Sequence, residues 1–257
     1  GGSNKLYLNN GDGTFKDATA SAGAGIDSPG FTMGSVFGDY DNDGDVDLYL
    51  ATGGQYEIEA NRLFANNGDG TFTDVTAAAG VGIKAFTYSA SFVDYDNDGD
   101  LDLDCANYGV GAKNTLFANN GNGTFTDVTD AAGVGDKSWS WMGVWSDIDN
   151  DGDVDLYVVN GRYPAGEPNK LFVNNGNGTF TEGAAAAGVN DANWGLGSSF
   201  ADVDNDGDQD LFVSNYIGGN NLYLNDGSGV FVKSSHKIAG EEGWGKGPTF
   251  GDVDNDG

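Results

Sequence analysis

Aspartate recurs at every second position between Asp39 and Asp47, in the stretch DYDNDGDVD, and an apolar, strand-like run follows it directly. The pattern returns four times, the last time cut off after its sixth residue, with first aspartates Asp94, Asp147, Asp202 and Asp252. Carboxylates so spaced, with a glycine at the sixth position for a sharp bend, can wrap Ca²⁺, which takes about six to eight oxygen ligands. Without a cation the crowded carboxylates would repel one another strongly, which argues against a metal-free acidic turn.

Each loop therefore predicts a calcium site with ligands at positions one, three, five and nine. In the first loop we expect the side chains of Asp39, Asp41, Asp43 and Asp47 to bind the ion, and Asp45 to contribute its backbone carbonyl. The matching sets are Asp94, Asp96, Asp98, Asp100 and Asp102; Asp147, Asp149, Asp151, Asp153 and Asp155; and Asp202, Asp204, Asp206, Asp208 and Asp210. The fifth loop supplies only Asp252, Asp254 and Asp256, so we expect four complete Ca²⁺ sites and one incomplete site. An EF-hand would need a glutamate at position twelve, where Leu50, Cys105, Val158 and Val213 stand instead.

The first aspartates are 55, 53, 55 and 50 residues apart, a period typical of repeated supersecondary units. Each repeat contains four strand-like stretches: FTMGSVFG (31–38) before the loop, DLYLAT after it, then NRLFANN and TFTDVT on either side of a GDG turn. Four short antiparallel strands repeated around a circle make a β-propeller. We predict an all-β propeller of five such blades, with a calcium loop between strands one and two of each. It forms a single domain over 4–257, after a linker or tag remnant at 1–3, with repeats at about 4–60, 61–113, 114–168, 169–219 and 220–257.

The loop, with NNGDGTFTDVTAAAGVG following in the same unit, resembles the FG-GAP/VCBS repeat of integrin α-subunit propellers. Its form is most similar to that of cartilage acidic protein and of bacterial ASPIC/UnbV-type proteins. The resemblance covers residues 4–257 and implies a propeller with one calcium ion per loop. Integrin propellers have seven blades whereas this chain holds five repeats, so the blade number does not carry over.

Composition limits the partners. The chain has 40 acidic and 11 basic residues, for a net charge of −29. Five acids in each of four loops and three in the fifth place 23 of the 40 inside the predicted sites. Nucleic acid is disfavoured because no cluster of Lys and Arg is present to neutralise phosphates. No apolar run approaches the roughly 18 to 20 residues that span a bilayer, and the single Cys105 predicts a buried thiol with no disulfide framework.

Aromatic residues stand at two fixed offsets before the loops. The lower ring, two residues before each first aspartate, is Phe37, Phe92, Trp145, Phe200 and Phe250. The upper ring, eight residues before, is Phe31, Phe86, Trp139, Trp194 and Trp244. Because both offsets are even, the two rings are expected on one face of strand one. We expect the lower ring to pack on small residues of a neighbouring blade, such as Gly38. The upper ring lies beside connections of variable length (52–60, 107–113, 160–168 and 215–219), so core packing and ligand contact both stay open for it.

The function that these features favour is recognition. We expect a calcium-stabilised adhesion or recognition module that binds protein or glycan through the face with the variable connections, at the cell surface, outside the cell or in the periplasm. The alternatives are a glycan-binding lectin and a structural protein that assembles with its own copies. We expect no enzyme, because His236 is the only histidine and no nucleophile–base pair is evident. A calcium-dependent catalyst using Glu57, Glu59 or Glu167 stays open.

The chain starts at a third strand, NKLYLNN, and stops inside the fifth loop. A closing blade built from both ends would therefore lack its second strand. We expect either a fragment of a longer chain or a strand donated by a partner, since an unpaired strand edge invites such addition. The fifth calcium site is expected to be the weakest, or to be completed from elsewhere.

Overall fold

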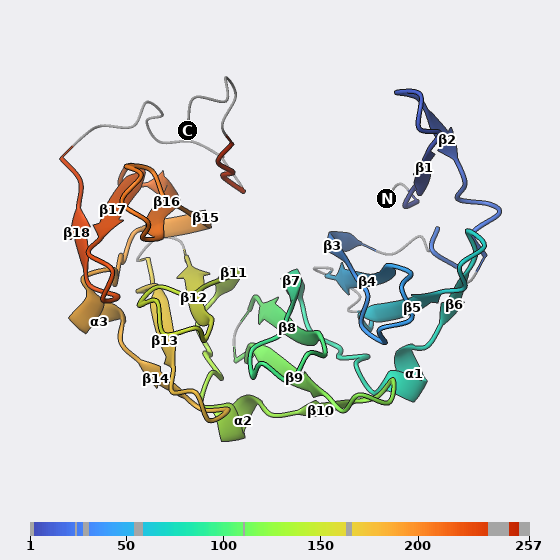
Figure 1. Cartoon of the computed structure of the whole chain (residues 1–257), viewed down its shortest axis with the longest axis horizontal. Coiled ribbons are helices and arrows are strands. Elements are labelled where there is room, and N and C mark those ends of the chain that lie inside the picture. The colour runs from blue at the N-terminus through green and yellow to red at the C-terminus, as the bar shows by residue number, and fades with distance from the viewer. Residues whose placement is uncertain are drawn as a thin grey trace. The chain divides into compact units, whose positions relative to one another are not determined.

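A computed structural model describes residues 3–23, 25–27, 31–53, 59–109, 111–162, 166–235 and 247–251. These residues form five antiparallel sheets, four with four strands and one with two (Figure 1). The all-β fold and the propeller class predicted from the sequence are thereby confirmed. The chain divides into two compact units, which are described separately: unit 1 comprises 1–94, 99–105 and 117–127, and unit 2 comprises 95–98, 106–116 and 128–257.

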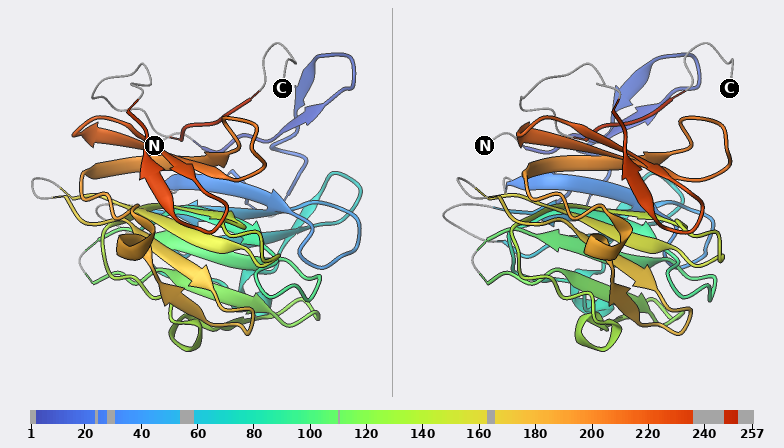
Figure 2. Two further views of the ribbon diagram at one scale, coloured as in Figure 1. Left: turned by 60° about the vertical axis from the view of Figure 1, so that its left-hand side comes forward. Right: turned by 90° about the vertical axis from the view of Figure 1, so that its left-hand side faces the viewer.

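Unit 1 contains a two-stranded sheet of β1 (Tyr7–Asn9) and β2 (Phe15–Asp17). Its first complete sheet consists of β3 (Thr32–Gly38), β4 (Asp47–Thr52), β5 (Arg62–Asn66) and β6 (Phe72–Asp74). The next sheet, most of which belongs to unit 1, consists of β7 (Thr87–Val93), β8 (Asp102–Asn107), β9 (Thr115–Asn119) and β10 (Phe125–Asp127). In Figure 2 the blue β1–β2 hairpin projects from the neighbouring β3–β6 sheet, and all its residues are exposed.

Unit 2 contains two complete sheets. The first consists of β11 (Ser140–Ser146), β12 (Asp155–Asn160), β13 (Lys170–Asn174) and β14 (Phe180–Glu182). The second consists of β15 (Trp194–Ala201), β16 (Asp210–Ile217), β17 (Asn221–Asn225) and β18 (Phe231–Lys233). In every complete sheet the strands are neighbours in chain order, which is the meander expected of a propeller blade.

Strand two is the most buried strand of a blade. Every residue of β4, β8 and β12 is buried, because sequences such as DLYLAT present apolar side chains on both faces. Strand three pairs with it in a repeated register, with Leu48 opposite Phe64 and Leu156 opposite Phe172. The Asp at the start of strand two thus lies at a fixed place at the end of the loop.

One lower-ring side chain packs on a small residue of the neighbouring sheet, as predicted, whereas two others pack on large aromatic side chains. In unit 1 the ring of Phe92 covers Gly38 so closely that a Cβ there would lie 2.7 Å from Cδ2 of Phe92. In unit 2 Phe200 packs on the core that includes Tyr157, and Trp145 meets the ring of Phe180 edge-on. The outermost lower-ring members, Phe37 and Phe250, stay 50% and 40% exposed. Cys105 is fully buried, with its Sγ 3.5 Å from the Tyr49 hydroxyl.

Among the described residues, three short helices that the sequence analysis did not predict follow the fourth strands. They are α1 (Thr76–Ala79), α2 (Thr129–Ala132) and α3 (Ala184–Ala187). Each ends at a glycine in the left-handed conformation, for example Gly80 with φ 81°, where glycine avoids the strain of a side chain. The buried hydroxyl of Tyr157 donates to the carbonyl of Val189 just beyond α3 (2.9 Å), which anchors the turn to the core.

Strand one contains a β-bulge, which corrects the expectation that both aromatic rings lie on one face of this strand. Its pairing shifts by a residue between Thr32 and Gly34 in β3, between Ser140 and Met142 in β11, and again within β15. An extra residue of this kind is a β-bulge, and it reverses the alternation of side chains beyond it. The reasoning that equal parity places both aromatic rings on one face therefore does not hold in these strands.

Some predictions concern residues outside the described part of the chain. Asp252, Asp254, Asp256, Trp244, Glu57 and His236 all lie there. The five described residues of the fifth strand-one region, 247–251, are not in a strand. Within the described ranges, no helix has the length and apolar character needed to cross a membrane.

Candidate metal centres and the loop face

The acidic loops connect strand one to strand two: loop 1 (39–47), loop 2 (94–102), loop 3 (147–155) and loop 4 (202–210). Their backbones repeat closely. The asparagine at position four is left-handed in all of them, with φ of 58° at Asn42 and 61° at Asn205, a conformation that Asn tolerates better than most residues. The glycine at position six has φ of 94° at Gly44 and 97° at Gly207, as expected for the sharp bend.

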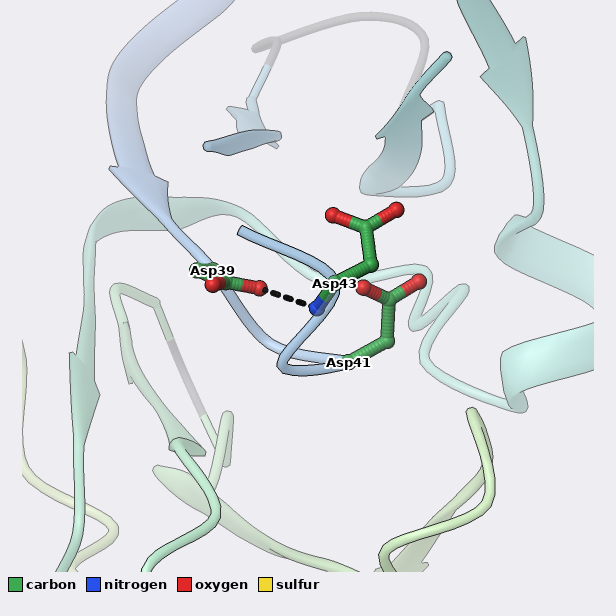
Figure 3. A group of neighbouring side chains, drawn as sticks. All are labelled: Asp39, Asp41 and Asp43. Carbon is green, nitrogen blue, oxygen red and sulfur yellow. Dashed lines mark hydrogen bonds between the residues drawn. The ribbon is translucent and has the colours of Figure 1, made fainter. Parts of the chain in front are cut away.

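Hydrogen bonds to the aspartates at loop positions one and five shape the loop. In loop 1 the Asp39 carboxylate accepts the backbone N–H of Asp43 at 3.1 Å (Figure 3). It also accepts the backbone N–H of Gly44 at 3.0 Å. Asp43 in turn accepts the N–H of Asp45 at 2.9 Å. These bonds turn the carboxylates of positions one, three and five toward one side of the loop.

The aspartate at position nine closes the loop at its buried end. Asp155 is 2% exposed; its Oδ2 accepts the N–H of Ile148 at position two (3.0 Å) and its Oδ1 accepts the N–H of Asn174 at the end of strand three (2.8 Å). Asp47 makes the same pair of contacts, with Tyr40 at 3.0 Å and Asn66 at 2.8 Å. This carboxylate thus connects the loop, strand two and strand three.

Three carboxylates meet in each of the four loops, with ligand atoms within 4.8 Å of one another. The four groups are Asp39, Asp41 and Asp43; Asp94, Asp96 and Asp102; Asp147, Asp149 and Asp155; and Asp202, Asp204 and Asp206. Every member stands at position one, three, five or nine, the positions predicted to bind through side chains. Each group could hold a metal ion.

The pKa values of the loop aspartates show that burial and mutual repulsion disfavour their charged forms when no cation is bound. Burial raises the pKa of Asp47 and of Asp155 from 3.8 to about 6 in each case, with nearby loop aspartates adding to the effect. Burial also raises the pKa values of Asp41 and Asp149, and the next contribution is repulsion from the position-five aspartate of the same loop. A cation among the oxygens would offset both causes.

One oxygen atom tests directly whether the residues fit a metal. Oδ1 of Asp149, at position three of loop 3, is buried and has no hydrogen-bond partner among the described residues. A buried carboxylate oxygen without a partner carries a large desolvation penalty. A hard cation beside Asp147, Asp149 and Asp155 would satisfy it, so these residues fit a metal ion bound by oxygens.

The aspartate at position seven of each loop takes a different role from the aspartates at the other four positions. Its side chain is in none of the clusters, and it accepts a hydrogen bond from the left-handed asparagine of the preceding loop instead. Within unit 1, Asn42 Nδ2 donates to Asp100 Oδ1 at 2.7 Å. Within unit 2, Asn97 donates to Asp153 at 2.7 Å and Asn150 donates to Asp208 at 2.8 Å. Successive loops are therefore connected side chain to side chain, and the carbonyl role expected for position seven stays a prediction.

The upper aromatic ring contacts the preceding blade. A Cβ on Gly53 would lie 3.1 Å from Cδ1 of Phe86, and one on Gly161 would overlap Cδ1 of Trp194. Trp139 meets Tyr108 edge-on with ring centroids 4.6 Å apart. All three upper-ring aromatics are partly buried, whereas Phe31 is 60% exposed. Packing therefore accounts for much of this ring, and its role in ligand contact stays a prediction.

On the face with the variable connections, the structure adds four residues that the sequence analysis did not name: Tyr108, Trp141, Arg162 and Tyr216. Arg162 lies over the Trp139 ring at 4.9 Å, and the Trp139 backbone N–H donates to Glu167 Oε2 at 2.7 Å. Tyr108 also meets Trp141 at 4.8 Å, and Tyr216 meets Trp194 at 4.9 Å. Tyr108 and Tyr216 each directly follow the asparagine that ends the core of strand two; that shared offset was the signal that could have identified them.

Comparisons with known proteins agree with this geometry. The model of the FG-GAP-like repeat matches residues 1–50, 39–103, 105–158, 147–213 and 202–257. Cartilage acidic protein 1 of Mus musculus is 48% identical over 58 residues, and its counterpart in Homo sapiens is 47% identical over 58 residues. Each of these matches covers 22% of this chain and 9% of the relative.

Among solved structures, a lectin from Agrocybe aegerita that recognises non-reducing terminal N-acetylglucosamine has a similar fold. The TM-score is 0.56 and the identity is 22%; the likeness covers 92% of this chain and 61% of the lectin chain.

Proposed function

The chain belongs to the FG-GAP-like repeat family, and from this premise we propose that it is a calcium-stabilised recognition module that binds protein or glycan outside the cell. The observation that carries the proposal is the recurrence of a cluster of three carboxylates in four loops, each with positions one and three and either position five or position nine. Because the four loops share their spacing and geometry, we infer that they share one function. That function is to bind a cation that holds strands one and two in place.

The donor set favours calcium over other ions. All the clustered ligands are carboxylate oxygens, and soft ligands such as Cys or His are absent from the four clusters. Flexible loops that supply several carboxylates suit Ca²⁺, whereas Mg²⁺ demands near-ideal octahedral geometry and keeps most of its waters. In this proposal positions one, three, five and nine hold Ca²⁺, position seven adds its carbonyl, and the ion neutralises the loop. An affinity typical of extracellular modules, with Kd of about 10⁻⁴–10⁻³ M, would fill the sites only outside the cytosol.

Recognition is assigned to the face opposite the calcium loops, where strand one begins. Aromatic and charged side chains meet there: Tyr108, Trp139 and Arg162 in one group, and Trp194 with Tyr216 in another. Aromatic rings beside polar connections are suited to stacking on sugars or anchoring a protein. The likeness of fold to a lectin is compatible with a glycan ligand.

We propose a binding module and not an enzyme. Of the carboxylates that a catalytic alternative would use, Glu167 is engaged by the backbone of Trp139. Most remaining acids of the described chain are in the loops, where a metal would engage the carboxylates at positions one, three, five and nine. An activity that depends on Glu59 or Glu167 would contradict this part of the proposal.

Calcium titration tests the metal. Protein freed of metal by chelating resin is titrated with Ca²⁺ and, separately, with Mg²⁺ in a calorimeter, and melting is followed by circular dichroism. We expect about four sites that prefer Ca²⁺ and a large rise in Tm on saturation, because a ligand that binds only the folded state stabilises it. An unchanged melting curve would refute the metal assignment.

A binding screen tests recognition. The calcium-loaded chain is applied to a glycan array and to surface proteins, with Trp194→Ala as the face variant and exposed Val232→Ala as the control. A glycan signal lost in Trp194→Ala would favour the lectin alternative, and a protein signal lost in the same variant would favour adhesion. Concentration-dependent assembly with neither signal would favour a structural role.

A further inference from the structure

The residue at position two of an acidic loop connects that loop to the following blade. In loop 3 it is Ile148, which lies between the clustered carboxylates of Asp147 and Asp149. The Ile148 carbonyl accepts a hydrogen bond from Asn225 Nδ2 at 2.7 Å. Its side chain is buried in the same core cluster as Phe231 of β18. A residue between two candidate metal ligands is therefore held by contacts with the next blade.

Asn225 extends this connection to the candidate metal site of its own blade. It ends β17 and is buried, so its polar groups need partners in the protein. Its backbone N–H donates to Asp210 Oδ1 at 2.8 Å. Asp210 is the predicted ligand at position nine of loop 4, and its Oδ2 accepts the N–H of Val203 at position two of that loop (3.0 Å). Asn225 thus joins position two of loop 3 to position nine of loop 4.

The same connection recurs between the other loops. Within unit 2, Asn174 Nδ2 donates to the carbonyl of Tyr95 at position two of loop 2 (2.9 Å). Within unit 1, Asn119 Nδ2 donates to the carbonyl of Tyr40 at position two of loop 1 (2.7 Å). In both cases the backbone N–H of the asparagine donates to the aspartate at position nine of the following loop, at 2.8 and 2.7 Å. Since three pairs of successive loops share this contact, it belongs to the repeat.

A second connection joins the same pairs of loops. Asn150, at position four of loop 3, donates from Nδ2 to Asp208 Oδ1 at position seven of loop 4 (2.8 Å). The other carboxylate oxygen of Asp208 lies over the hairpin turn of its own blade, where a Cβ on Gly227 would be 2.6 Å from it. Asp208 is thus held by loop 3 on one side and by the turn on the other. Its backbone carbonyl is the ligand predicted for position seven.

We infer that Asn150 and Asn225, with their counterparts in the other blades, are positioning residues for the next calcium site and make calcium binding in successive loops positively cooperative. The inference rests on the proposed binding of calcium. A loop that holds the ion keeps its carbonyl at position two and its amide at position four in place. These two groups then hold positions nine and seven of the next loop, so less ordering remains when that loop binds. The coupling is reciprocal, so loop 4 strengthens binding in loop 3 by the same factor.

Electrostatics alone predicts coupling of the opposite sign. Loop 3 contains five aspartates, so binding of Ca²⁺ changes its formal charge from −5 to −3. A less negative neighbour attracts a cation less strongly, which by itself would make binding in successive loops negatively cooperative. Salt at about 0.15 M screens the exposed carboxylates, whereas the hydrogen bonds between the loops persist. The sign of the coupling in such salt therefore separates the two effects.

Nuclear magnetic resonance of the full chain reads each loop separately. The N–H of the glycine at position six donates to the aspartate at position one, at 3.0 Å for both Gly44 in loop 1 and Gly207 in loop 4, so its chemical shift reports calcium binding in that loop. Calcium is titrated into the wild type and into Asp149→Ala, which removes a clustered carboxylate from loop 3. We expect the calcium concentration at half-saturation to rise about fivefold at Gly207 and by less than about twofold at Gly44. An unchanged or lower value at Gly207 would overturn the inference, and so would an equal rise at both glycines.

Two matched substitutions test the connection with every carboxylate intact. Asn150→Gly and Asn42→Gly each remove the side chain of a left-handed residue, with φ of 60° and 58°, a conformation that glycine adopts without strain. Asn150→Gly should raise the half-saturation concentration at Gly207 about threefold. Asn42→Gly removes a contact with Asp100 of loop 2 and should leave the value at Gly207 unchanged. Equal effects of the two variants at Gly207 would contradict the inference.

Failure of the inference is distinguishable from failure of the metal proposal. If calcium shifts the amides at Gly44 and Gly207 but loop 4 responds to neither loop 3 variant, the sites bind calcium independently and only the coupling is wrong. If calcium shifts neither amide in the wild type, the metal proposal fails, and the inference built on it fails as well.

Discussion

Replacing Asp155 by asparagine should have effects of different size, and even sign, with and without calcium. In the calcium-free protein the buried Asp155 carboxylate has a pKa raised from 3.8 to about 6. The folded state therefore binds a proton more tightly than the unfolded state, and stability falls as pH rises from about 4 to about 7. At pH 7.5 the charge destabilises the fold by roughly 3 kcal/mol, which Asp155→Asn removes.

The substitution also has a cost. The two carboxylate oxygens accept from Ile148 and Asn174, and an asparagine can accept only one of these bonds. A buried donor left unpaired costs about 1–3 kcal/mol, so the net change without calcium is about 0–2 kcal/mol of stabilisation. With calcium at 100 times Kd the site stabilises the wild type by about 2.7 kcal/mol over its calcium-free state, and the variant loses this contribution. Because the calcium-free variant starts about 0–2 kcal/mol more stable, it is less stable than the wild type in calcium by about 1–3 kcal/mol.

Urea denaturation at pH 7.5, in calcium and after treatment with chelating resin, measures both changes. Asp69→Asn is the matched control: Asp69 accepts from Thr71 in a hairpin turn (3.0 Å), and Asn122 makes the same contact with Thr124 (3.1 Å). We expect a change within about 0.5 kcal/mol for this control in both conditions. A second series between pH 5 and pH 7.5 without calcium should show the wild type gaining stability as pH falls, and Asp155→Asn gaining less. Equal destabilisation by Asp155→Asn with and without calcium would refute the reasoning.

Three further changes test the packing and the loop contacts. Gly38→Ala should lower stability by about 1–3 kcal/mol in urea denaturation because its Cβ would overlap the Phe92 ring; an unchanged midpoint would mean that the sheets separate easily. Asn150→Ala removes the contact with Asp208, so calcium titration should show weaker binding at loop 4, at a stability cost of about 1 kcal/mol; unaltered binding would show that the loops act independently. Tyr157→Phe removes the hydroxyl that accepts from Asn169 Nδ2 and donates to the Val189 carbonyl. The carbonyl keeps the N–H of Asp191, so the cost of about 1–3 kcal/mol comes mainly from Asn169 and is measured by thermal melting against wild type.

The sequence alone determined most of the strands and the places where carboxylates cluster, because both follow from local patterns. Alternating aspartates with a glycine at the sixth place define the loop wherever they occur, and residues 47–52 form β4 as expected from DLYLAT. Three of the four predicted side-chain ligands cluster in each loop, and the fourth, which is Asp47, Asp98, Asp151 or Asp210, lies outside the cluster. The same local rules identified strand three from NRLFANN and its glycine turn. They failed at the short helices, since four residues such as TAAA have no periodicity to detect.

Only the tertiary structure decided the contacts between segments that are far apart in the chain. The partner of Asp47 is Asn66 in strand three, and the partner of Asp100 is Asn42 in the preceding loop; neither spacing follows from the repeat pattern. The β-bulge at Thr32–Gly34 changed which side chains share a face, because one extra residue in a paired strand leaves no mark in the sequence. The raised pKa of Asp155 depends on burial by neighbouring strands. Sequence specifies which groups can bind a metal, and packing sets the low dielectric surroundings that make their charge costly without one.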